Sequence, residues 1–173
     1  TLARLQTDYI DLYQLHGPAL NELDHYNDIL SFFEKFQKEG KIRAYGISVR
    51  TPQDGIAVIQ KFHCPCIQIN FSLMDQRALD HGLFPLCAER QVGVIARTPL
   101  CFGYLTGEYT GGETFPESDH RSRWDKAKIK KWVLTNKRFL SLIPQDGRRP
   151  SSQFALQYCL SFDIISTVIP GML

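Results

Sequence analysis

The strongest constraint on the fold is a regular alternation of short apolar runs with amphipathic stretches along all 173 residues. Strands that alternate with helices are typical of parallel βαβ units, whose right-handed crossovers build an open sheet or a barrel. The sequence therefore predicts an α/β fold in a single domain. Five runs have the length and composition of strands, namely residues 10–15, 42–49, 66–70, 92–96 and 164–169.

Helices are predicted between these strands. In residues 27–40, four apolar side chains recur at helical spacing, and Gly40 provides a stop. Thr51 and Pro52 have the character of an N-cap and a first helical residue. Further helices are predicted at residues 83–90, 124–142 and 150–160, and a long glycine-containing loop at residues 100–122.

The glycines favour a barrel over a nucleotide-binding open sheet. An open dinucleotide-binding sheet carries a glycine fingerprint after its first strand, and this sequence has none. The segment from Gly103 to Gly107 is not a P-loop, because no Lys-Ser or Lys-Thr pair follows it. A complete (β/α)8 barrel needs roughly 200–250 residues. The 173 residues here fall below that length, and the alternation of strands and helices fits either an open sheet or a barrel.

Composition narrows the function classes. Hydrophobic residues make up 43% and charged residues 22%, as in ordinary globular proteins, and a net charge of +2 does not favour nucleic acid as a partner. No apolar run approaches the ~18–20 residues that span a bilayer, so we expect no membrane association. Five cysteines without a framework spacing indicate a reducing, cytoplasmic setting, and Cys64-Pro-Cys66 lacks the second ligand pair of a zinc site. We expect no metal.

His16 is the clearest candidate for chemistry. It ends the first predicted strand, and α/β barrels build their sites at the carboxyl ends of strands. Its position near the amino terminus suggests that its chemical partners precede Thr1.

Four segments together resemble the aldo-keto reductase superfamily, and they occur in the right order over essentially the whole chain. The resemblance implies a (β/α)8 TIM barrel of which residues 1–173 form the fourth to eighth strands, so that the first three βα units are absent and the single domain is truncated at both ends. The segments are residues 5–16, 40–48, 92–107 and 167–171.

The resemblance implies reversible hydride transfer between NADPH and an aldehyde or ketone. The family's proton donor is a tyrosine tuned by a lysine and an aspartate, while a histidine orients the carbonyl. Only the histidine can be carried over, onto His16. The other three belong to earlier strands, so the chain as given is expected to be inactive by itself.

The resemblance also assigns residues to the cofactor, NADP(H). Ser48 and Gln68 match residues that hold the nicotinamide carboxamide, although Val49 replaces the asparagine that usually follows the serine. Arg97 stands where many members stack an aromatic ring on the nicotinamide, and a rim salt bridge is the alternative interpretation. Residues matched to the phosphate-binding stretches are Thr98, Pro99, Leu100 and Gly103 for the pyrophosphate and Gly171 for the adenosine phosphate.

The preferred hypothesis is therefore a cytoplasmic NADPH-dependent aldo-keto reductase acting on a small-molecule carbonyl substrate. A non-catalytic regulatory or binding subunit on the same fold is the alternative, and an inactive partial gene product is a third possibility. Five strands cannot close an eight-stranded barrel. We therefore expect unpaired strand edges and self-association through them.

Overall fold

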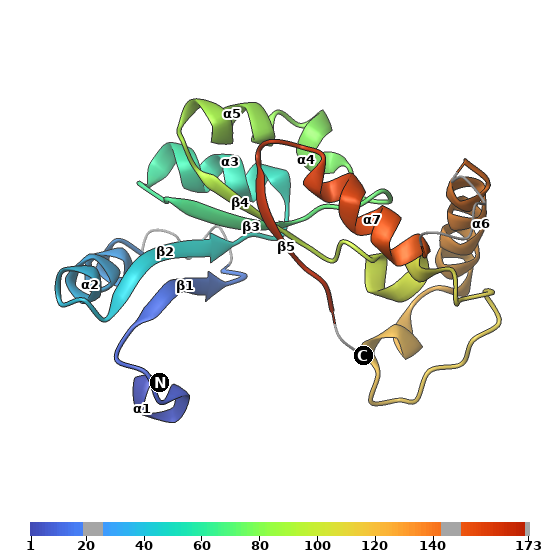
Figure 1. Cartoon of the computed structure of the whole chain (residues 1–173), viewed down its shortest axis with the longest axis horizontal. Helices are drawn as coiled ribbons and strands as arrows, with labels where there is room; N and C mark the ends of the chain where they lie inside the picture. Colours follow the sequence, from blue (N-terminus) through green and yellow to red (C-terminus); the bar gives the residue numbers. More distant parts are fainter. Residues whose placement is uncertain (19–25, 143–149, 172–173) are drawn as a thin grey trace.

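The computed structural model describes residues 1–18, 26–142 and 150–171, and its centre is one parallel sheet. The strands lie side by side in chain order, each paired in parallel with its successor (Figure 1). Each predicted strand is confirmed to within one residue at either end. The strands are β1 (Ile10–His16), β2 (Ile42–Ser48), β3 (Cys66–Asn70), β4 (Gly93–Arg97) and β5 (Ile165–Ile169).

Helices fill the connections between strands. The four-residue helix α1 agrees with the expectation from the resemblance that the chain begins late in a helix, whereas the four-residue helix α4 and the 3-10 turns in the segment expected to be a loop were not predicted. The helices are α1 (Leu2–Leu5), α2 (Tyr26–Lys38), α3 (Pro52–Lys61), α4 (Arg77–Asp80), α5 (Leu83–Glu89), η2 (Cys101–Thr106), η3 (His120–Arg123), α6 (Lys126–Leu142) and α7 (Ser151–Leu160).

The start of α3 follows the sequence prediction closely. Thr51 is the N-cap, and Pro52 is the first helical residue. The Thr51 hydroxyl accepts a hydrogen bond from the backbone N–H of Asp54, and the Asp54 carboxylate accepts one from the backbone N–H of Thr51. This reciprocal capping box satisfies two N–H groups that a helix start otherwise leaves without partners.

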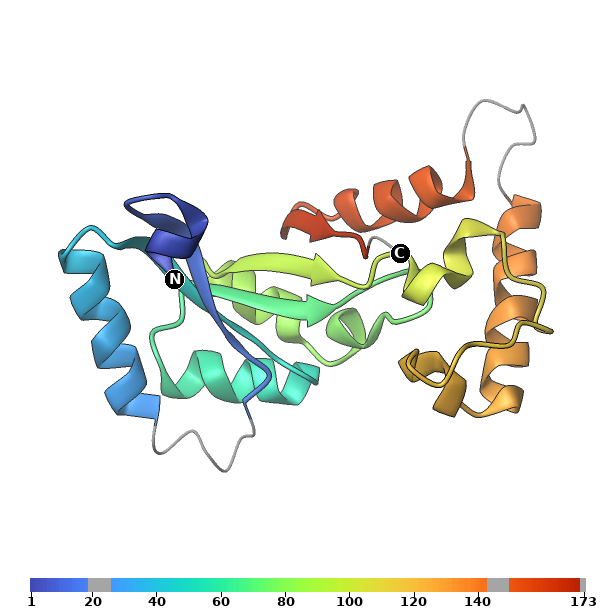
Figure 2. The ribbon, with the colours of Figure 1, turned by 90° about the horizontal axis from the view of Figure 1, so that it is seen from below.

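The two faces of the sheet differ in chemistry. Alternate residues of a strand point to opposite faces, and Ile47, Ile67 and Ile69 are almost fully buried in the main apolar core with residues of α2, α3 and α5. The helices α3, α4 and α5 lie on that side (Figure 1). In Figure 2 the opposite face is turned to the viewer and stands largely open. Its strand residues include the polar Gln14, Ser48 and Gln68 together with the apolar Leu12 and Ile95, so polar groups are concentrated toward the carboxyl ends of β1 to β3.

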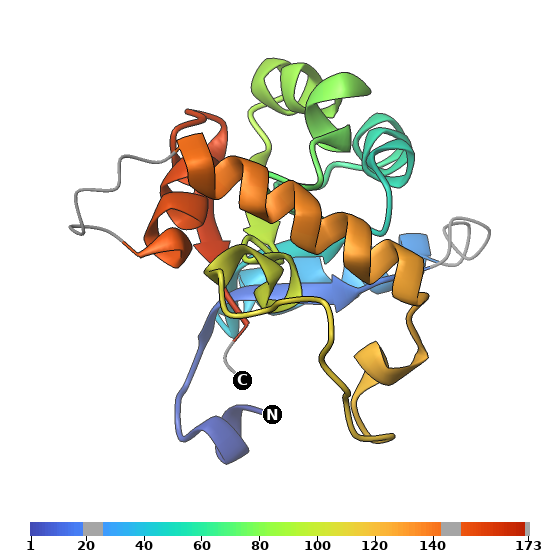
Figure 3. The ribbon, with the colours of Figure 1, turned by 90° about the vertical axis from the view of Figure 1, so that its right-hand side faces the viewer.

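The segment between β4 and α6, predicted as a long loop, contains short helical turns. It contains η2 and η3, and a hydrogen bond from Arg121 of η3 to Phe102 of η2 connects the two. Arg121 is 8% exposed and donates hydrogen bonds to the Asp119 carboxylate, the Phe102 carbonyl and the Tyr109 hydroxyl. Together with α6 this segment forms a layer beyond the carboxyl ends of the strands (Figure 3).

The sheet is open at both sides. β1 pairs only with β2, and β5 pairs only with β4 among the described residues. The five strands and their helices thus make a partial β/α barrel, as predicted. No helix within the described ranges combines the length and apolar character needed to cross a bilayer.

Candidate functional site at the carboxyl ends of the strands

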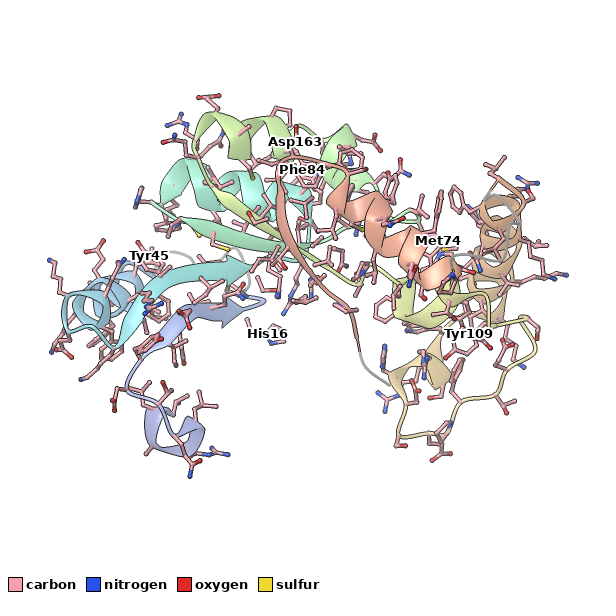
Figure 4. All side chains as sticks on the ribbon, viewed as in Figure 1. His16, Tyr45, Met74, Phe84, Tyr109 and Asp163 are labelled. Carbon is pink, nitrogen blue, oxygen red and sulfur yellow. The ribbon has the colours of Figure 1, made fainter. Side chains whose placement is uncertain are left out.

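Three of the predicted site residues lie in one row across three strands. His16 is the register partner of Ser48, and Ser48 is the register partner of Gln68. Because side chains in register on adjacent parallel strands point to the same face, all three share the open face of the sheet. Figure 4 shows His16 at the end of β1, on the side of the sheet away from Phe84 of α5.

The backbone after His16 is tied to β2. The N–H of Gly17 donates a 3.0 Å hydrogen bond to the carbonyl of Ser48. Gly17 has a φ of +59°, a left-handed conformation that glycine adopts without strain. The exposed His16 imidazole is therefore held at the sheet edge by its backbone, while its ring faces solvent.

Buried polar atoms without partners collect at this edge. Among the described residues, the Ser48 hydroxyl oxygen, the Gln14 side-chain oxygen and the Arg97 Nε atom are buried and have no hydrogen-bond partner. Ser48 is only 2% exposed. Most buried polar groups in proteins are hydrogen-bonded, and an unpaired one is costly. Ser48 and Arg97 end their strands, so their unpaired atoms are candidate contacts for a ligand, whereas the hydroxyl of Tyr104, a fourth such atom, lies in η2.

Arg97 reaches across the sheet from the end of β4. Its Nη2 atom donates a 3.0 Å hydrogen bond to the carbonyl of Val49, which follows β2. Burial of the guanidinium lowers the pKa of Arg97 from its usual value, and the positive charge of Arg50 acts in the same direction. Arg97 forms no salt bridge among the described residues. The guanidinium is anchored at one end and retains unused donor capacity at Nε.

The sequence reasoning did not identify Asn70. Its side-chain oxygen accepts a 3.0 Å hydrogen bond from the hydroxyl of Thr98, and it is the register partner of Arg97. Asn70 lies two residues beyond Gln68 on the same strand, so period-two alternation of polar residues was the signal that could have found it. Thr98 has a φ of +56°, which is uncommon for a threonine and concentrates strain at this turn.

A cavity of about 600 Å³ extends from Arg97 toward the end of β5. It gathers five of the predicted cofactor residues, whereas Pro99 is fully buried beneath the turn and does not line it. Sequence reasoning missed its other walls, which come from the η2 and η3 segments and from the residues after β5. The lining residues are Arg97, Thr98, Leu100, Phe102, Gly103, Thr106, His120, Arg121, Ile169, Pro170 and Gly171.

The cysteine pair lies at the other end of β3. Burial raises the pKa of the Cys64 thiol to about 12 and that of the Cys66 thiol to about 11. Both thiols are thus protonated near neutral pH, and thiolate is the form that binds metals. Within residues 1–18, 26–142 and 150–171, no three His, Cys, Asp or Glu side chains gather as a metal-ion site.

Parallel strands with helices in their connections, polar groups at the carboxyl ends and an adjoining cavity define part of a β/α-barrel enzyme. The chain belongs to the aldo/keto reductase family, whose sequence model matches residues 1–173. A relative named uncharacterized oxidoreductase YqkF, from Bacillus subtilis strain 168, is 33% identical over 171 residues, which are 99% of this chain and 53% of that protein.

The solved structures agree with the family assignment. The holo form of aldo-keto reductase AKR11C1 from Bacillus halodurans is 34% identical, with a TM-score of 0.72 over 99% of this chain and 51% of that one. A Schizosaccharomyces pombe relative named aldo-keto reductase yakc [NADP(+)] is 29% identical over 126 residues, which are 71% of this chain and 36% of that protein. An Escherichia coli relative named NADH-specific methylglyoxal reductase is 32% identical over 111 residues, which are 64% of this chain and 34% of that protein. The chain spans about half the length of the proteins it matches.

Proposed function

We propose that these residues form the cofactor-binding part of an aldo-keto reductase that uses NADPH to reduce an aldehyde or ketone. The observation that carries the proposal is the row of His16, Ser48 and Gln68 beside a cavity lined by Arg97 and Gly171. The row offers a proton-handling group and amide-binding groups, and the cavity, which none of the three row residues lines, would hold the phosphate chain.

The residues fit a nicotinamide cofactor. Such a cofactor presents a carboxamide with donors and acceptors, and the buried Ser48 hydroxyl lacks a partner among the described residues. The Gln68 side chain lies beside it in the register. When bound, the cofactor supplies the hydride that reaches the carbonyl carbon. We assign Ser48 and Gln68 to holding the nicotinamide carboxamide.

Arg97 and the turn after it would hold the rest of the cofactor. A planar guanidinium can stack on a ring or pair with phosphate, and Arg97 is already fixed through Val49. Thr98, Leu100 and Gly103 line the same cavity, which is long enough to continue to Gly171. Pro99 would act through the shape of the turn, since its side chain is buried.

His16 would orient the substrate. Its exposed ring can donate an N–H hydrogen bond to the carbonyl oxygen and stabilise the negative charge that develops there. The general acid that delivers the proton is expected outside these 173 residues. Its absence would cost a factor on the order of 10²–10⁴ in rate.

Cofactor titration tests the proposal. NADPH is titrated into the 173-residue chain while the fluorescence of the reduced nicotinamide is followed. Ser48→Ala should weaken binding by roughly fivefold, the equivalent of one net hydrogen bond of about 1 kcal/mol. Its urea midpoint should stay close to that of the wild type, because the Ser48 hydroxyl has no protein partner among the described residues to lose.

The matched control is Ser161→Ala, an exposed serine whose hydroxyl bonds only the Tyr158 carbonyl of its own turn. This variant should bind NADPH like the wild type. Equal affinity of the Ser48 and Ser161 variants for NADPH would contradict the role assigned to Ser48. No NADPH binding by a folded chain would remove the proposed function. A parallel titration with NADH measures which of the two nicotinamide cofactors is preferred.

The replacement of the family's asparagine by Val49 favours testing the non-catalytic alternative as well. Val49 is 2% exposed and packs its side chain in the main apolar core, so its hydrogen bonds come from the backbone, which donates to the Gln68 carbonyl and accepts from Arg97. A regulatory subunit would bind NADPH yet fail to oxidise it with any aldehyde, even when joined to a segment carrying the missing tyrosine, lysine and aspartate. Turnover in such a joined protein would exclude that role.

A further inference from the structure

A second cavity, of about 630 Å³, lies on the β3 side of the turn that follows β4. It shares Thr98, Phe102 and His120 with the cavity lined by Arg97 and Gly171, and its other walls come from the end of β3 and the segment after it, from Cys101 of η2, and from Trp124 and α6. Its volume is that of a small-molecule site. The lining residues are Asn70, Ser72, Met74, Asp75, Gln76, Arg77, Thr98, Cys101, Phe102, His120, Trp124, Lys128 and Trp132.

Three aromatic rings form one wall of this second cavity. Phe102 and Trp132 are nearly parallel, with ring centroids 6.3 Å apart and 4° between their planes. Trp124 meets Phe102 edge-on at 4.8 Å and Trp132 edge-on at 5.3 Å. Both tryptophans of the chain therefore line this cavity. Large, rigid aromatic faces favour a planar apolar ligand.

Lys128 places a positive charge at the same wall. Its ammonium nitrogen lies 5.2 Å from the Trp124 ring centroid and 4.6 Å from that of Trp132. These cation–π contacts orient the ammonium group. Lys128 forms no salt bridge within the described ranges. It is therefore a cation available to a ligand.

The other charges around the cavity are already paired. Asp75 and Arg77 form a bidentate pair at 2.7 and 2.8 Å, so the carboxylate does not present a free negative charge. His120 faces the Asp119 carboxylate at 3.6 Å. Among the charged residues that line this cavity, Lys128 is therefore the one without an ion-pair partner in the described residues. Its positive charge favours an anionic ligand.

We propose that this cavity is a second small-molecule site that takes a planar aromatic carboxylate. The ring would lie against Trp124 and Trp132, and the carboxylate would accept hydrogen bonds from Lys128. The proposal does not rest on cofactor binding, since the two cavities differ in most of their walls. Thr98, Phe102 and His120 line both cavities.

The two tryptophan indole N–H groups report directly on this site. In a nitrogen-15 NMR titration of the 173-residue chain, 2-naphthoate should shift both indole signals in a saturable manner. The uncharged 2-naphthamide and the non-aromatic cyclohexanecarboxylate should each bind several times more weakly. Lys128→Met should weaken 2-naphthoate binding by roughly fivefold to tenfold, the size expected for a partly exposed charge-assisted contact.

The matched control is Lys130→Met, which removes an exposed charge from the same helix outside the cavity lining. It should leave the affinity for 2-naphthoate unchanged. Equal effects of the two lysine variants, or no saturable shift of the indole signals, would overturn the proposal. Competition by NADP⁺ or AMP for the 2-naphthoate site would also overturn it, because the cavity would then belong to the cofactor. The cofactor proposal itself fails separately, by absence of NADPH binding.

Discussion

Replacing Gly46 by alanine probes the close contact between β2 and β3, the strands that carry Ser48 and Gln68. Gly46 lies in β2, two residues before Ser48, where the strand passes β3. A Cβ atom at this position would lie 2.7 Å from the carbonyl oxygen and 3.1 Å from the Cβ of Cys66. The closest of these is a backbone atom, which cannot rotate away as a flexible side chain can. Relief therefore requires β2 and β3 to separate locally.

The magnitude follows from two opposing terms. Forcing one extra carbon into a packed region costs about 1–3 kcal/mol, and a backbone clash belongs near the upper end of that range. Changing glycine to alanine also lowers the conformational entropy of the unfolded chain, which raises the free energy of unfolding by about 0.4–1 kcal/mol. The net loss in free energy of unfolding should be about 2 kcal/mol. For a chain of this length that corresponds to a fall in Tm of roughly 4–8 °C.

Urea unfolding followed by circular dichroism, at a protein concentration low enough to keep the chain monomeric, measures this loss. The matched control is Gly112→Ala, because a Cβ there meets nothing within 4 Å and Gly112 has no positive φ. The control should be unchanged or slightly more stable. The Gly46 variant should also bind NADPH more weakly, since Ser48 and Gln68 move with the two strands. Unfolding midpoints that agree for the two glycine variants would refute the reasoning.

Three further predictions concern local stability and association. Thr51→Ala removes the hydroxyl half of the α3 capping box and should cost about 1 kcal/mol in urea unfolding, whereas no change would mean that the cap is redundant. The hydrogen bond from Arg121 lowers the pKa of Asp119 from 3.8 to about 2. The contact therefore stabilises the η2–η3 layer fully above a pH of about 4. This stabilisation is lost as the pH falls toward 2. Protease cleavage of the layer should rise over that interval in the wild type and depend less on pH in Asp119→Asn. Analytical ultracentrifugation should show self-association through the outer edges of β1 and β5, and a compact monomer would contradict it.

Much of the architecture could be predicted from local patterns. Strand period and composition are local properties, so the limits of β1 to β5 were obtained to within one residue, and the Thr51 cap was found from two adjacent residues. His16 was predicted to end a strand, and the resemblance assigned Ser48 and Gln68 to the cofactor, so the three residues are expected at the same edge of a parallel sheet. The register confirms that placement, while the chemical roles of the three residues remain to be tested.

The sequence by itself determined a parallel α/β sheet with polar residues at the ends of its strands. Only the tertiary structure decided how distant residues meet: Arg97 reaches Val49, Thr98 reaches Asn70, and the buried Arg121 reaches Phe102 within the segment predicted as a loop. Arg97 and Val49 are 48 positions apart in the sequence, and Thr98 and Asn70 are 28 apart. Local propensity carries no information about such pairs, because strand register and loop packing bring them together only after the chain has folded.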